Sequence, residues 1–252
     1  MSNFALITGA SSGIGLELAE LVANNHQNVV LVARRTDRLK QLSSRLEKKY
    51  DINALCISKD LSQPGSAQDI FDLTEKGGIV VDCLINNAGS ICYGNFAEAK
   101  WSDLLALIQL QILALTHLTK LFLPDMLRRN KGRILNIGST GSFSPGPFTA
   151  VYCATKSYVL SLSEAIAEEV KGTGVTVTTL CPGGVRTDFD RSEQSFLAMK
   201  AGKVARIGYR AMLKKKRIVV PGLHNKIPVF LARFLPRSLM SKMAKSIILK
   251  HR

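Results

Sequence analysis

Short apolar runs alternate along the chain with longer segments in which apolar residues recur every three or four positions. The short runs occupy residues 3–7, 29–33, 54–58, 83–85, 133–137 and 175–180. Continuous apolar runs of this length are typical of parallel strands that are buried on both faces. The longer segments occupy residues 16–22, 38–50, 64–76, 101–129 and 152–170, and their periodicity predicts helices. The alternation predicts an α/β fold in which one doubly wound parallel sheet carries helices on both faces.

The long segment 101–129 differs from the other predicted helices because it is apolar on more than one face. Such a helix is either buried in the core or forms a subunit interface. No uninterrupted run in the chain approaches the ~20 apolar residues of a membrane span. The first predicted strand begins so close to the N-terminus that we expect no signal peptide before it.

A glycine-rich turn follows the first predicted strand and opens the first predicted helix. It reads Gly9-Ala-Ser-Ser-Gly-Ile-Gly15. Glycines permit a tight turn and a close approach of the backbone to a phosphate, and a helix N-terminus attracts anions. We therefore predict a cofactor-binding cradle at Gly9, Ser11, Ser12, Gly13, Ile14 and Gly15. The alternative is an ordinary strand–helix loop, because the spacing G-x-x-x-G-x-G differs from the G-x-G-x-x-G fingerprint of dinucleotide-binding folds.

The end of the second predicted strand indicates the type of cofactor. In doubly wound folds an acidic residue there binds the ribose of NAD, whereas an arginine accommodates the 2′-phosphate of NADP. The chain has Arg34 and Arg35 there and no acid before Asp37, which favours NADP(H). Solvated charges at the start of a helix are the alternative. Asp60 and Leu61 follow the third strand, and we expect them to contact the adenine.

Three side chains between residues 139 and 156 can act together as an acid–base site. Tyr152 and Lys156 are four residues apart and share one face of the predicted helix. An ammonium about 4 Å from a phenol is worth ~4 kcal/mol at an effective dielectric of ~20, enough to lower the phenol pKa by about 3 units. Such a phenol can act as a general acid near neutral pH. Ser139 ends the preceding strand and could bond a substrate oxygen. The alternative is that Tyr152 and Lys156 only decorate an amphipathic helix.

The composition limits the classes of protein that fit. Apolar residues make up 46% of the 252 residues, enough for a large core. The five cysteines show neither C-x-x-C nor metal-ligand spacing, so we expect free thiols, a reducing cytoplasmic compartment and no metal. The net charge of +15 is a C-terminal feature, because residues 194–252 hold 15 of the 34 basic residues and none of the 19 acidic ones.

Taken together, these motifs resemble those of the short-chain dehydrogenase/reductase family, in the same order over residues 3–190. The resemblance rests on the glycine turn, on Asn86-Asn-Ala-Gly89, on Ser139, Tyr152 and Lys156, and on Pro182-Gly-Gly-Val-Arg-Thr187. More narrowly, the chain is similar to DltE-like and ketoacyl-reductase-like members, which share a tail ending in a V-P-G strand, here Val220-Pro-Gly222. The resemblance implies a single-domain Rossmann-type fold. It adds further residues to the expected cofactor site: Asn87, Ala88, Gly89, Tyr152, Lys156, Pro182, Gly183, Val185 and Thr187.

The resemblance also implies a mechanism. Tyr152 donates the proton to a carbonyl oxygen, Lys156 binds the ribose and lowers the phenol pKa, and Ser139 orients the carbonyl. The family usually has an Asn thirteen residues before the proline of a Leu-Pro pair, where it holds a water linked to the lysine. Gln111 stands at that distance from Pro124. We therefore include Gln111 among the catalytic candidates, and we hypothesise that its longer side chain impairs proton relay while cofactor binding survives.

The residues expected around the nicotinamide are mostly apolar or aromatic. They lie at 90–93, 143–148 and 189–197. Such a lining favours a hydrophobic ketone, aldehyde or alcohol as the substrate. We expect the segment after Thr187 to form a lid.

Residues 1–222 are expected to form the catalytic domain, and residues 223–252 a basic amphipathic helical extension packed on it. Apolar residues such as Phe230 alternate there with basic ones such as Lys226. A basic amphipathic helix can lie on an anionic membrane. Packing over the substrate pocket or against a partner subunit is one alternative, and contact with an anionic substrate is another. We expect no nucleic-acid partner, because no groove-reading motif accompanies the basic cluster 214–217.

We therefore expect an NADP(H)-dependent oxidoreductase that acts on a small-molecule carbonyl or alcohol. We expect it to form a homodimer or homotetramer in the cytoplasm. Peripheral contact of its basic tail with a membrane is a further possibility. A 3-ketoacyl reductase acting on CoA- or carrier-linked chains is an alternative with the same chemistry. A non-catalytic NADP sensor or interaction protein is an alternative of another class, and the intact set of Ser139, Tyr152 and Lys156 argues against it.

Overall fold

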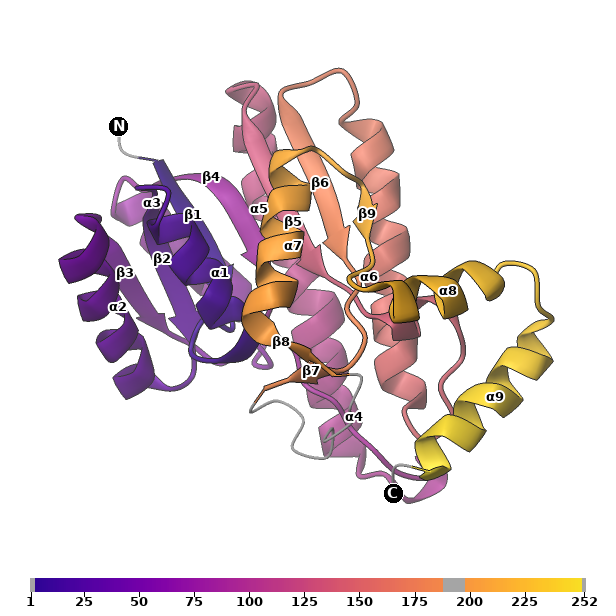
Figure 1. Ribbon diagram of the computed structural model, residues 1–252. Coiled ribbons are helices and arrows are strands. Elements are labelled where there is room, and N and C mark those ends of the chain that lie inside the picture. The colour runs from indigo at the N-terminus through magenta and orange to yellow at the C-terminus, as the bar shows by residue number, and fades with distance from the viewer. Residues whose placement is uncertain (1–2, 188–197, 251–252) are drawn as a thin grey trace.

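The computed structural model describes residues 3–187 and 198–250, which are built around one parallel sheet (Figure 1). Its strands pair in the order β3-β2-β1-β4-β5-β6-β9. Their bounds are β1 Asn3–Thr8, β2 Asn28–Ala33, β3 Ala54–Ser58, β4 Val80–Asn86, β5 Gly132–Ile137, β6 Val175–Leu180 and β9 Ile218–Val219. A separate small sheet pairs β7 Val185–Arg186 with β8 Met199–Lys200. The predicted doubly wound, Rossmann-type α/β fold is confirmed.

Strand β2 shows why these apolar runs become inner strands. Its sequence Asn-Val-Val-Leu-Val-Ala is rich in β-branched residues, and all but the first residue are buried. Successive side chains of a strand point to opposite faces, so only a sheet covered on both faces can bury such a run. The register places Leu31 between Ile7 of β1 and Cys56 of β3.

Helices cover both faces of the sheet, as the alternation predicted. On one face lie α1 Gly13–Ala23, α2 Thr36–Tyr50 and α7 Ala201–Leu213. They bury Leu18, Leu39 and Val204 against the strands. On the other face lie α3 Ser66–Lys76, α5 Ala114–Arg128 and α6 Ala150–Glu169, which contribute Ile70 and Phe122 to a second core. The two cores hold the sheet rigidly between them.

The sheet has a topological switch point between β1 and β4. The chain runs from β1 outward to β2 and β3 on one side, and from β4 outward to β5 and β6 on the other. In open α/β sheets, ligands bind outside the carboxyl ends of the strands at such a point. The glycine turn follows β1 and residues 87–89 follow β4, so two of the predicted cofactor segments meet at this crevice.

The segment 101–128 forms one continuous helix in three parts: α4 Trp101–Ile108, a π-helical turn Gln109–Leu113, and α5. With a mean hydropathy of 1.5 over its most apolar stretch, it could cross a membrane by length and composition alone. No uninterrupted apolar run revealed this, because polar residues such as Gln111 break the pattern. The helix packs against α3, α6 and β4, and Leu118 and Met126 lie in the core. One side of the helix therefore packs in the core, whereas residues such as Trp101 and Leu113 are exposed.

Helix α7 was not predicted from the sequence, and strand β9 lies two residues before the position expected for it. The buried residues of α7, such as Val204, Gly208 and Met212, follow helical spacing but are interspersed with basic residues. Strand β9 has two residues and pairs with β6, and so short a strand has no readable periodicity. The resemblance suggested a strand at 220–222. The structure ends that strand at Val219 instead, and proline lacks the N–H that a continuing ladder would need.

Two helices after β9 form what we call the C-terminal arm, residues 223–250. They are α8 Leu223–Leu231 and α9 Arg237–Lys250, and they extend from the body at the right of Figure 1. The arm meets the body at the start of α8, where Asn225 packs so closely on Gly183 that a Cβ there would clash. No residue of α8, all of which the structure describes, is buried. The extension is therefore helical, as expected, but largely uncovered.

Candidate active site

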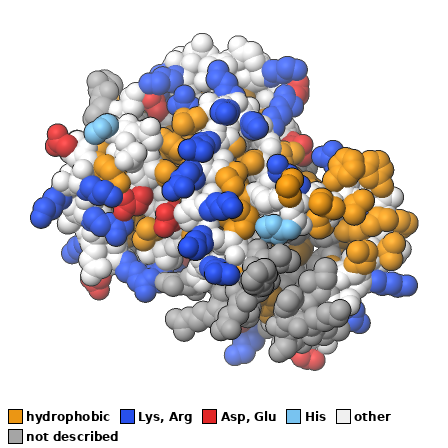
Figure 2. Space-filling model, in the orientation of Figure 1, with side chains coloured by type: hydrophobic (Ala, Val, Ile, Leu, Met, Phe, Trp, Pro, Cys, Tyr) orange, Lys and Arg blue, Asp and Glu red, His pale blue; other side chains and the backbone are white. Residues whose placement is uncertain are grey.

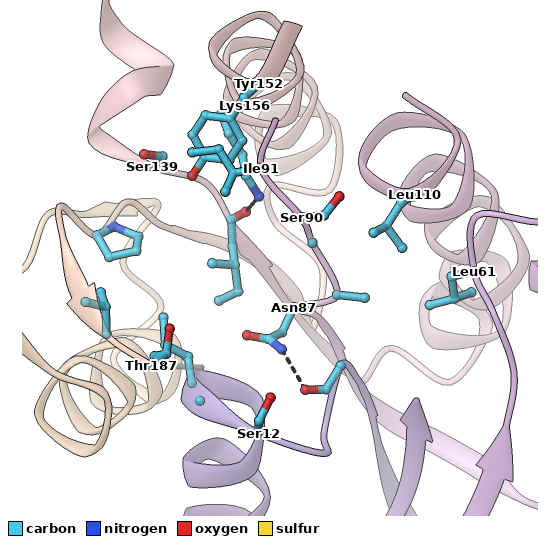
Figure 3. A pocket seen from close by; sticks show the side chains of 18 of the residues that line it. Ser12, Leu61, Asn87, Ser90, Ile91, Leu110, Ser139, Tyr152, Lys156 and Thr187 are labelled. Carbon is cyan, nitrogen blue, oxygen red and sulfur yellow. Dashed lines mark hydrogen bonds between the residues drawn. The ribbon is translucent and has the colours of Figure 1, made fainter. Parts of the chain in front are cut away.

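A cleft of about 690 Å³ lies at the switch point, beyond the carboxyl ends of the strands (Figure 3). The predicted site residues that line it are Gly9, Ser11, Ser12, Gly13, Ile14, Arg34, Arg35, Asp60, Leu61, Asn87, Ala88, Gly89, Ser139, Tyr152, Lys156, Pro182, Gly183, Val185 and Thr187. Two predicted residues, Gly15 and Gln111, are not among the lining residues. The fold thus brings seven separate segments of the chain to one cavity.

Asn87 fastens the glycine turn to the end of β4. Its side-chain amide donates to the carbonyl oxygens of Thr8 at 2.9 Å and Gly9 at 3.3 Å. The hydroxyl of Thr8 in turn accepts from the backbone N–H groups of Asn87 and Ala88. Gly9 has a φ of +67°, and a Cβ on it would meet the Asn87 amide at 2.7 Å. A glycine is therefore required at position 9, and the turn is held in one shape.

The N-terminus of α1 lies at the floor of the cleft. Ser12 is the N-cap and makes no side-chain capping bond, and the first turn contains no acidic residue. The first N–H groups of a helix lack intrahelical partners and attract anions. Gly15 lies behind the turn, where a Cβ would clash with the Gly9 carbonyl. Gly15 thus lets α1 approach the turn closely rather than lining the cavity.

Arg35 bends back over the glycine turn. Its guanidinium donates to Ser11 Oγ at 3.1 and 3.2 Å and to Ser12 Oγ at 2.7 Å. This places a planar N–H fork and two hydroxyls together, which is a favourable environment for a phosphate. Arg34 is exposed, and its guanidinium lies 3.9 Å from the carboxylate of Asp60, at the limit of an ion pair. The two arginines therefore differ in how firmly they are held.

The residues after β3 form one side of the cleft. Asp60 accepts from the backbone N–H and the hydroxyl of Ser62 at 2.9 and 2.8 Å, so its carboxylate stabilises the turn. Leu61 is buried and forms an apolar part of the wall. Lys59 also lines the cleft and pairs with Asp69 at 2.9 Å. No sequence pattern had marked Lys59, because a lysine after a strand is common.

Ser139 is held by a capping box at the start of the 3-10 turn Thr140–Phe143. Its hydroxyl accepts from the backbone N–H of Gly141 at 3.0 Å, and its own N–H donates to Ser142 Oγ at 3.1 Å. Because the hydroxyl accepts the Gly141 bond, its proton can donate to a further oxygen. A Cβ on Gly141 would lie 3.5 Å from Ser139 Oγ and 3.8 Å from the Tyr152 ring. The serine and the tyrosine are therefore neighbours on the same wall (Figure 3).

Lys156 extends beneath Tyr152 from the next turn of α6. Its ammonium lies 5.8 Å from the centre of the Tyr152 ring and donates to the Ile137 carbonyl oxygen at 2.8 Å (Figure 3). Burial lowers the pKa of Lys156 from its ordinary 10.5 to about 8, and the nearby Cys181 thiol acts in the opposite direction. The sequence argument assumed a permanently charged lysine. A lysine with a pKa of about 8 is still mostly protonated at pH 7 and loses its charge above pH 8.

Gln111 lies in the π-helical turn, a local irregularity that is frequent at functional sites. Its side-chain N–H donates to the Ser90 carbonyl oxygen at 2.9 Å, whereas its Oε1 is buried and has no hydrogen-bond partner among the described residues. A Cβ on Gly89 would lie 3.5 Å from this oxygen and 3.7 Å from Lys156 Nζ. Gln111 is thus adjacent to the buried end of Lys156, behind the surface of the cleft.

The segment 182–187 forms a further wall of the cleft. The Pro182 carbonyl oxygen accepts from the Thr140 N–H at 2.8 Å, which ties this segment to the Ser139 turn. A Cβ on Gly13 would lie 3.1 Å from the methyl group of Thr187, so Thr187 lies across from the glycine turn. The expected lid, residues 188–197, lies outside the described residues.

The end of the cleft near Tyr152 is mostly apolar. Ser90, Ile91 and Tyr93 line the cleft, as expected, together with Ala106 and Leu110 from the long helix, whereas residues 143–148, also expected there, are not among the lining residues. Ala106 and Leu110 were missed because an apolar helix is ordinarily read as core. This lining suits a hydrophobic group.

Two of the five thiols, Cys83 and Cys181, are buried and held in the protonated form. All five cysteines are unpaired. Burial raises the pKa of both Cys83 and Cys181 to about 12, so these thiols stay protonated. Within the described ranges, no group of three or more His, Cys, Asp or Glu side chains is placed to hold a metal ion.

Comparison with known sequences identifies the family. The short chain dehydrogenase profile matches residues 3–197. The chain belongs to the short-chain dehydrogenase family. It is therefore an oxidoreductase by family. The very-long-chain 3-oxoacyl-CoA reductase of Homo sapiens is 30% identical over 99% of this chain and 78% of its own length. The proteins of that name from Rattus norvegicus and Mus musculus are matched over only 61% and 64% of their length.

Solved structures of short-chain dehydrogenases have the same fold. A short-chain dehydrogenase from Sphingobium yanoikuyae in complex with NADPH has a TM-score of 0.82 and 30% identity, with 89% of both chains covered. A structure from work on 7beta-hydroxysteroid dehydrogenase stereoselectivity has a TM-score of 0.90 over 96% of both chains, at 24% identity. The second likeness concerns the fold alone.

The cleft of this short-chain dehydrogenase fits a nicotinamide dinucleotide. The rigid glycine turn and the α1 N-terminus suit a pyrophosphate. The hydroxyls of Ser11 and Ser12 beside the Arg35 fork suit a further phosphate. At the other end, Tyr152 and Lys156 project into the cavity from α6 (Figure 3). Donors for both ends of a dinucleotide are therefore present in one cavity.

Proposed function

We propose that the protein is an NADP(H)-dependent oxidoreductase that interconverts a hydrophobic carbonyl compound and its alcohol. One observation carries this proposal: Ser139, Tyr152 and Lys156 line the same cleft as the glycine turn. A reactive group at the phenol would therefore be in reach of a dinucleotide bound to the turn. When bound, the nicotinamide supplies or accepts the hydride.

In this proposal, Tyr152 moves the proton. Its hydroxyl donates a proton to the carbonyl oxygen during reduction and takes it back during oxidation. Ser139, held by its capping box, donates a hydrogen bond to the same oxygen and orients it. Lys156 binds the ribose hydroxyls and, while it is protonated, favours the charged form of the phenol. Gln111 borders the lysine and influences how protons reach it.

The preference for NADP(H) over NAD(H) is part of the proposal. It is supported by the Arg35 fork beside two serine hydroxyls, and by the lack of an acid at the end of β2. A carboxylate there would repel the 2′-phosphate, whereas an arginine attracts it. Arg34 is free to swing toward the same phosphate because its contact with Asp60 is long.

A 3-ketoacyl chain linked to CoA or to a carrier protein is the second candidate substrate. The name of the human relative and the basic C-terminal region favour it. A free hydrophobic ketone is favoured by the apolar end of the cleft. Reduction of ketoacyl-CoA without reduction of free ketones would decide for the thioester.

We also propose that the protein forms a homo-oligomer and resides in the cytoplasm. Trp101 and Leu113, on the long helix, are 67% and 57% exposed. One turn after Leu113, the hydroxyls of Thr116 and Tyr158 join α5 to α6 at 3.0 Å, and Tyr158 is itself 36% exposed. Exposed apolar residues on two adjoining helices are suited to a twofold contact with a second copy.

Substitution of Tyr152 by Phe tests the proposed chemistry. We expect Tyr152→Phe to lower NADPH-dependent turnover of a ketone panel at least about 100-fold, the lower limit of a general acid's contribution. Stabilisation by NADPH should persist, at about 2.7 kcal/mol when the cofactor is at 100 times its Kd. Tyr158→Phe, an exposed tyrosine on the same helix, is the matched control and should retain activity. Equal activity of the two variants would contradict the proposal.

A non-catalytic NADP sensor is the candidate from another class. Gln111 and the basic arm are the features that favour it. Such a protein would be stabilised by NADPH, would turn over neither free ketones nor ketoacyl-CoA, and would be indifferent to Tyr152→Phe. Turnover by the unaltered chain excludes this role.

A further inference from the structure

The C-terminal arm presents an apolar face that the body does not cover. Leu223, Ile227, Phe230, Leu231 and Phe234 are all exposed, with Leu223 at 74% and Phe234 at 71%. Figure 2 shows hydrophobic side chains gathered over the arm at the right of the molecule. Isolated exposed apolar residues are ordinary, but a contiguous group of this kind marks an interaction surface.

A row of basic side chains runs along α7 beside the arm. Lys203, Arg206, Arg210 and Lys214 are exposed and recur at the spacing of one helix face. In Figure 2 this row crosses the middle of the same face that carries the apolar area. Across the described part of the chain, none of the four lies within ion-pair distance of an acidic side chain. Their charge is therefore available to an anionic partner.

The basic row and the apolar face together indicate the kind of partner. Apolar side chains next to a basic row match the acyl and headgroup regions of an anionic bilayer. A second copy of the chain fits less well, because residues 194–252 contain no acidic residue and a twofold contact would bring like charges together. A nucleic acid would leave the exposed phenylalanines without a role.

The arm is attached beside the substrate end of the cleft. Asn225 packs on Gly183, which lines the cleft, and donates to the Pro221 carbonyl oxygen at 2.7 Å. Helix α8 also contacts the turn Thr140–Phe143, which begins directly after Ser139. A surface bound by α8 would therefore adjoin the wall that carries the reactive side chains.

We propose that the C-terminal arm and the basic row of α7 dock on an anionic lipid bilayer, and that the cleft receives a lipid-soluble carbonyl substrate from that bilayer. The second half rests on the function proposed above, whereas the docking does not. Docking near the cleft spares an apolar substrate a passage through water, where it is poorly soluble.

Co-sedimentation of the full chain with vesicles tests the docking. We expect binding to vesicles of phosphatidylcholine with added phosphatidylglycerol, weaker binding to phosphatidylcholine alone, and a decline with rising salt. Leu231→Asp should weaken vesicle binding at least about tenfold, because it places a charge where the docked protein would bury an apolar side chain in the bilayer. Leu73→Asp on α3 is the matched control, since Leu73 and Leu231 are 49% and 46% exposed, and it should bind as the unaltered chain does.

A triple substitution tests the contribution of the basic row to vesicle binding. The triple substitution Lys203→Gln, Arg206→Gln and Arg210→Gln should weaken binding to the anionic vesicles about a hundredfold, because each basic residue near such a surface contributes roughly fivefold. Binding to phosphatidylcholine alone should change little. A triple variant that binds both kinds of vesicle as the unaltered chain does would overturn the proposal.

Two further outcomes would overturn the docking. One is an equal loss of vesicle binding in Leu73→Asp and Leu231→Asp. The other is a Leu231→Asp protein whose molecular mass in solution is half that of the unaltered chain but which binds vesicles normally. The latter would assign the face to a second copy. With a ketone dissolved in the vesicles, Leu231→Asp should lose turnover, while a water-soluble ketone is still reduced. If the unaltered chain docks but reduces neither ketone, the proposed function fails and the docking stands.

Discussion

Gln111 Oε1 and Lys156 Nζ face the same buried point beside Gly89. They lie 3.5 and 3.7 Å from the position that a Cβ on this glycine would take. Within the part of the chain that the structure describes, the amide oxygen has no hydrogen-bond partner. Burial has removed the lysine from water, which lowers its pKa to about 8. The length of the side chain at position 111 therefore decides how much room remains between an acceptor and a buried ammonium.

Shortening Gln111 should speed turnover. We expect Gln111→Asn to raise kcat roughly 2- to 10-fold, a small part of what proton transfer can contribute, because the shorter amide leaves more room for a bridge to Lys156. The thermal shift with NADPH should stay the same. Gln109→Asn, in the same π-helical turn, is the control and should leave kcat unchanged. An unchanged or lower kcat in Gln111→Asn would refute the relay hypothesis.

Removal of the buried charge should stabilise the protein while it abolishes activity. The folded-state pKa of Lys156, about 8, lies below its ordinary 10.5, so the unfolded chain binds more protons between these values and stability rises with pH across that window. We expect Lys156→Met to raise the free energy of unfolding at pH 7 by up to about 3 kcal/mol. The advantage should shrink toward pH 10.5.

Urea unfolding of the wild type and of Lys156→Met at pH 7 and pH 10 measures this. Lys171→Met, which removes an exposed lysine, should show no such pH-dependent difference. A Lys156→Met advantage that is the same at both pH values would mean that the lysine is not desolvated as described.

Cofactor preference should depend on Arg35 more than on Arg34. Loss of a charge-assisted hydrogen bond costs about 1.5–3 kcal/mol, so Arg35→Leu should weaken NADPH binding roughly 10- to 100-fold. NADH binding should change little, because NADH has no 2′-phosphate. Arg34→Leu should have a smaller effect, since Arg34 is exposed and only loosely paired with Asp60. Calorimetric titration with both cofactors measures this, and equal losses for NADPH and NADH would contradict it.

The oligomer should separate when the exposed face of the long helix carries a charge. We expect Leu113→Asp to convert the oligomer to monomer, because Leu113 is exposed beside the contact between Thr116 and Tyr158. Light scattering after size exclusion reports the mass. Leu223→Asp, in the C-terminal arm, should leave the mass unchanged. A monomer from Leu223→Asp alone would move the interface to the arm.

The sequence by itself determined the architecture and the segments of the site. Apolar runs such as 29–33 become strands because no other place in a soluble fold can bury them on both faces. Once the strands are parallel, whatever follows each strand must gather at one edge, so the glycine turn, Arg35, Asn87, Ser139 and residues 182–187 could be assigned to a single site. These inferences needed only contiguous sequence and the geometry of a sheet.

The tertiary structure decided the properties that depend on neighbours distant in the chain. Burial of Lys156, whose ammonium bonds the Ile137 carbonyl oxygen of β5, changes its pKa, and a local π-helical turn brings Gln111 close to it. Arg35 reaches the glycine turn only because β1 and β2 are paired. Whether the apolar residues of the C-terminal arm are covered depends on packing, and the fold leaves them exposed. The burial of a side chain, its hydration and its contacts depend on how the whole molecule packs, so they could not be predicted from the sequence pattern alone.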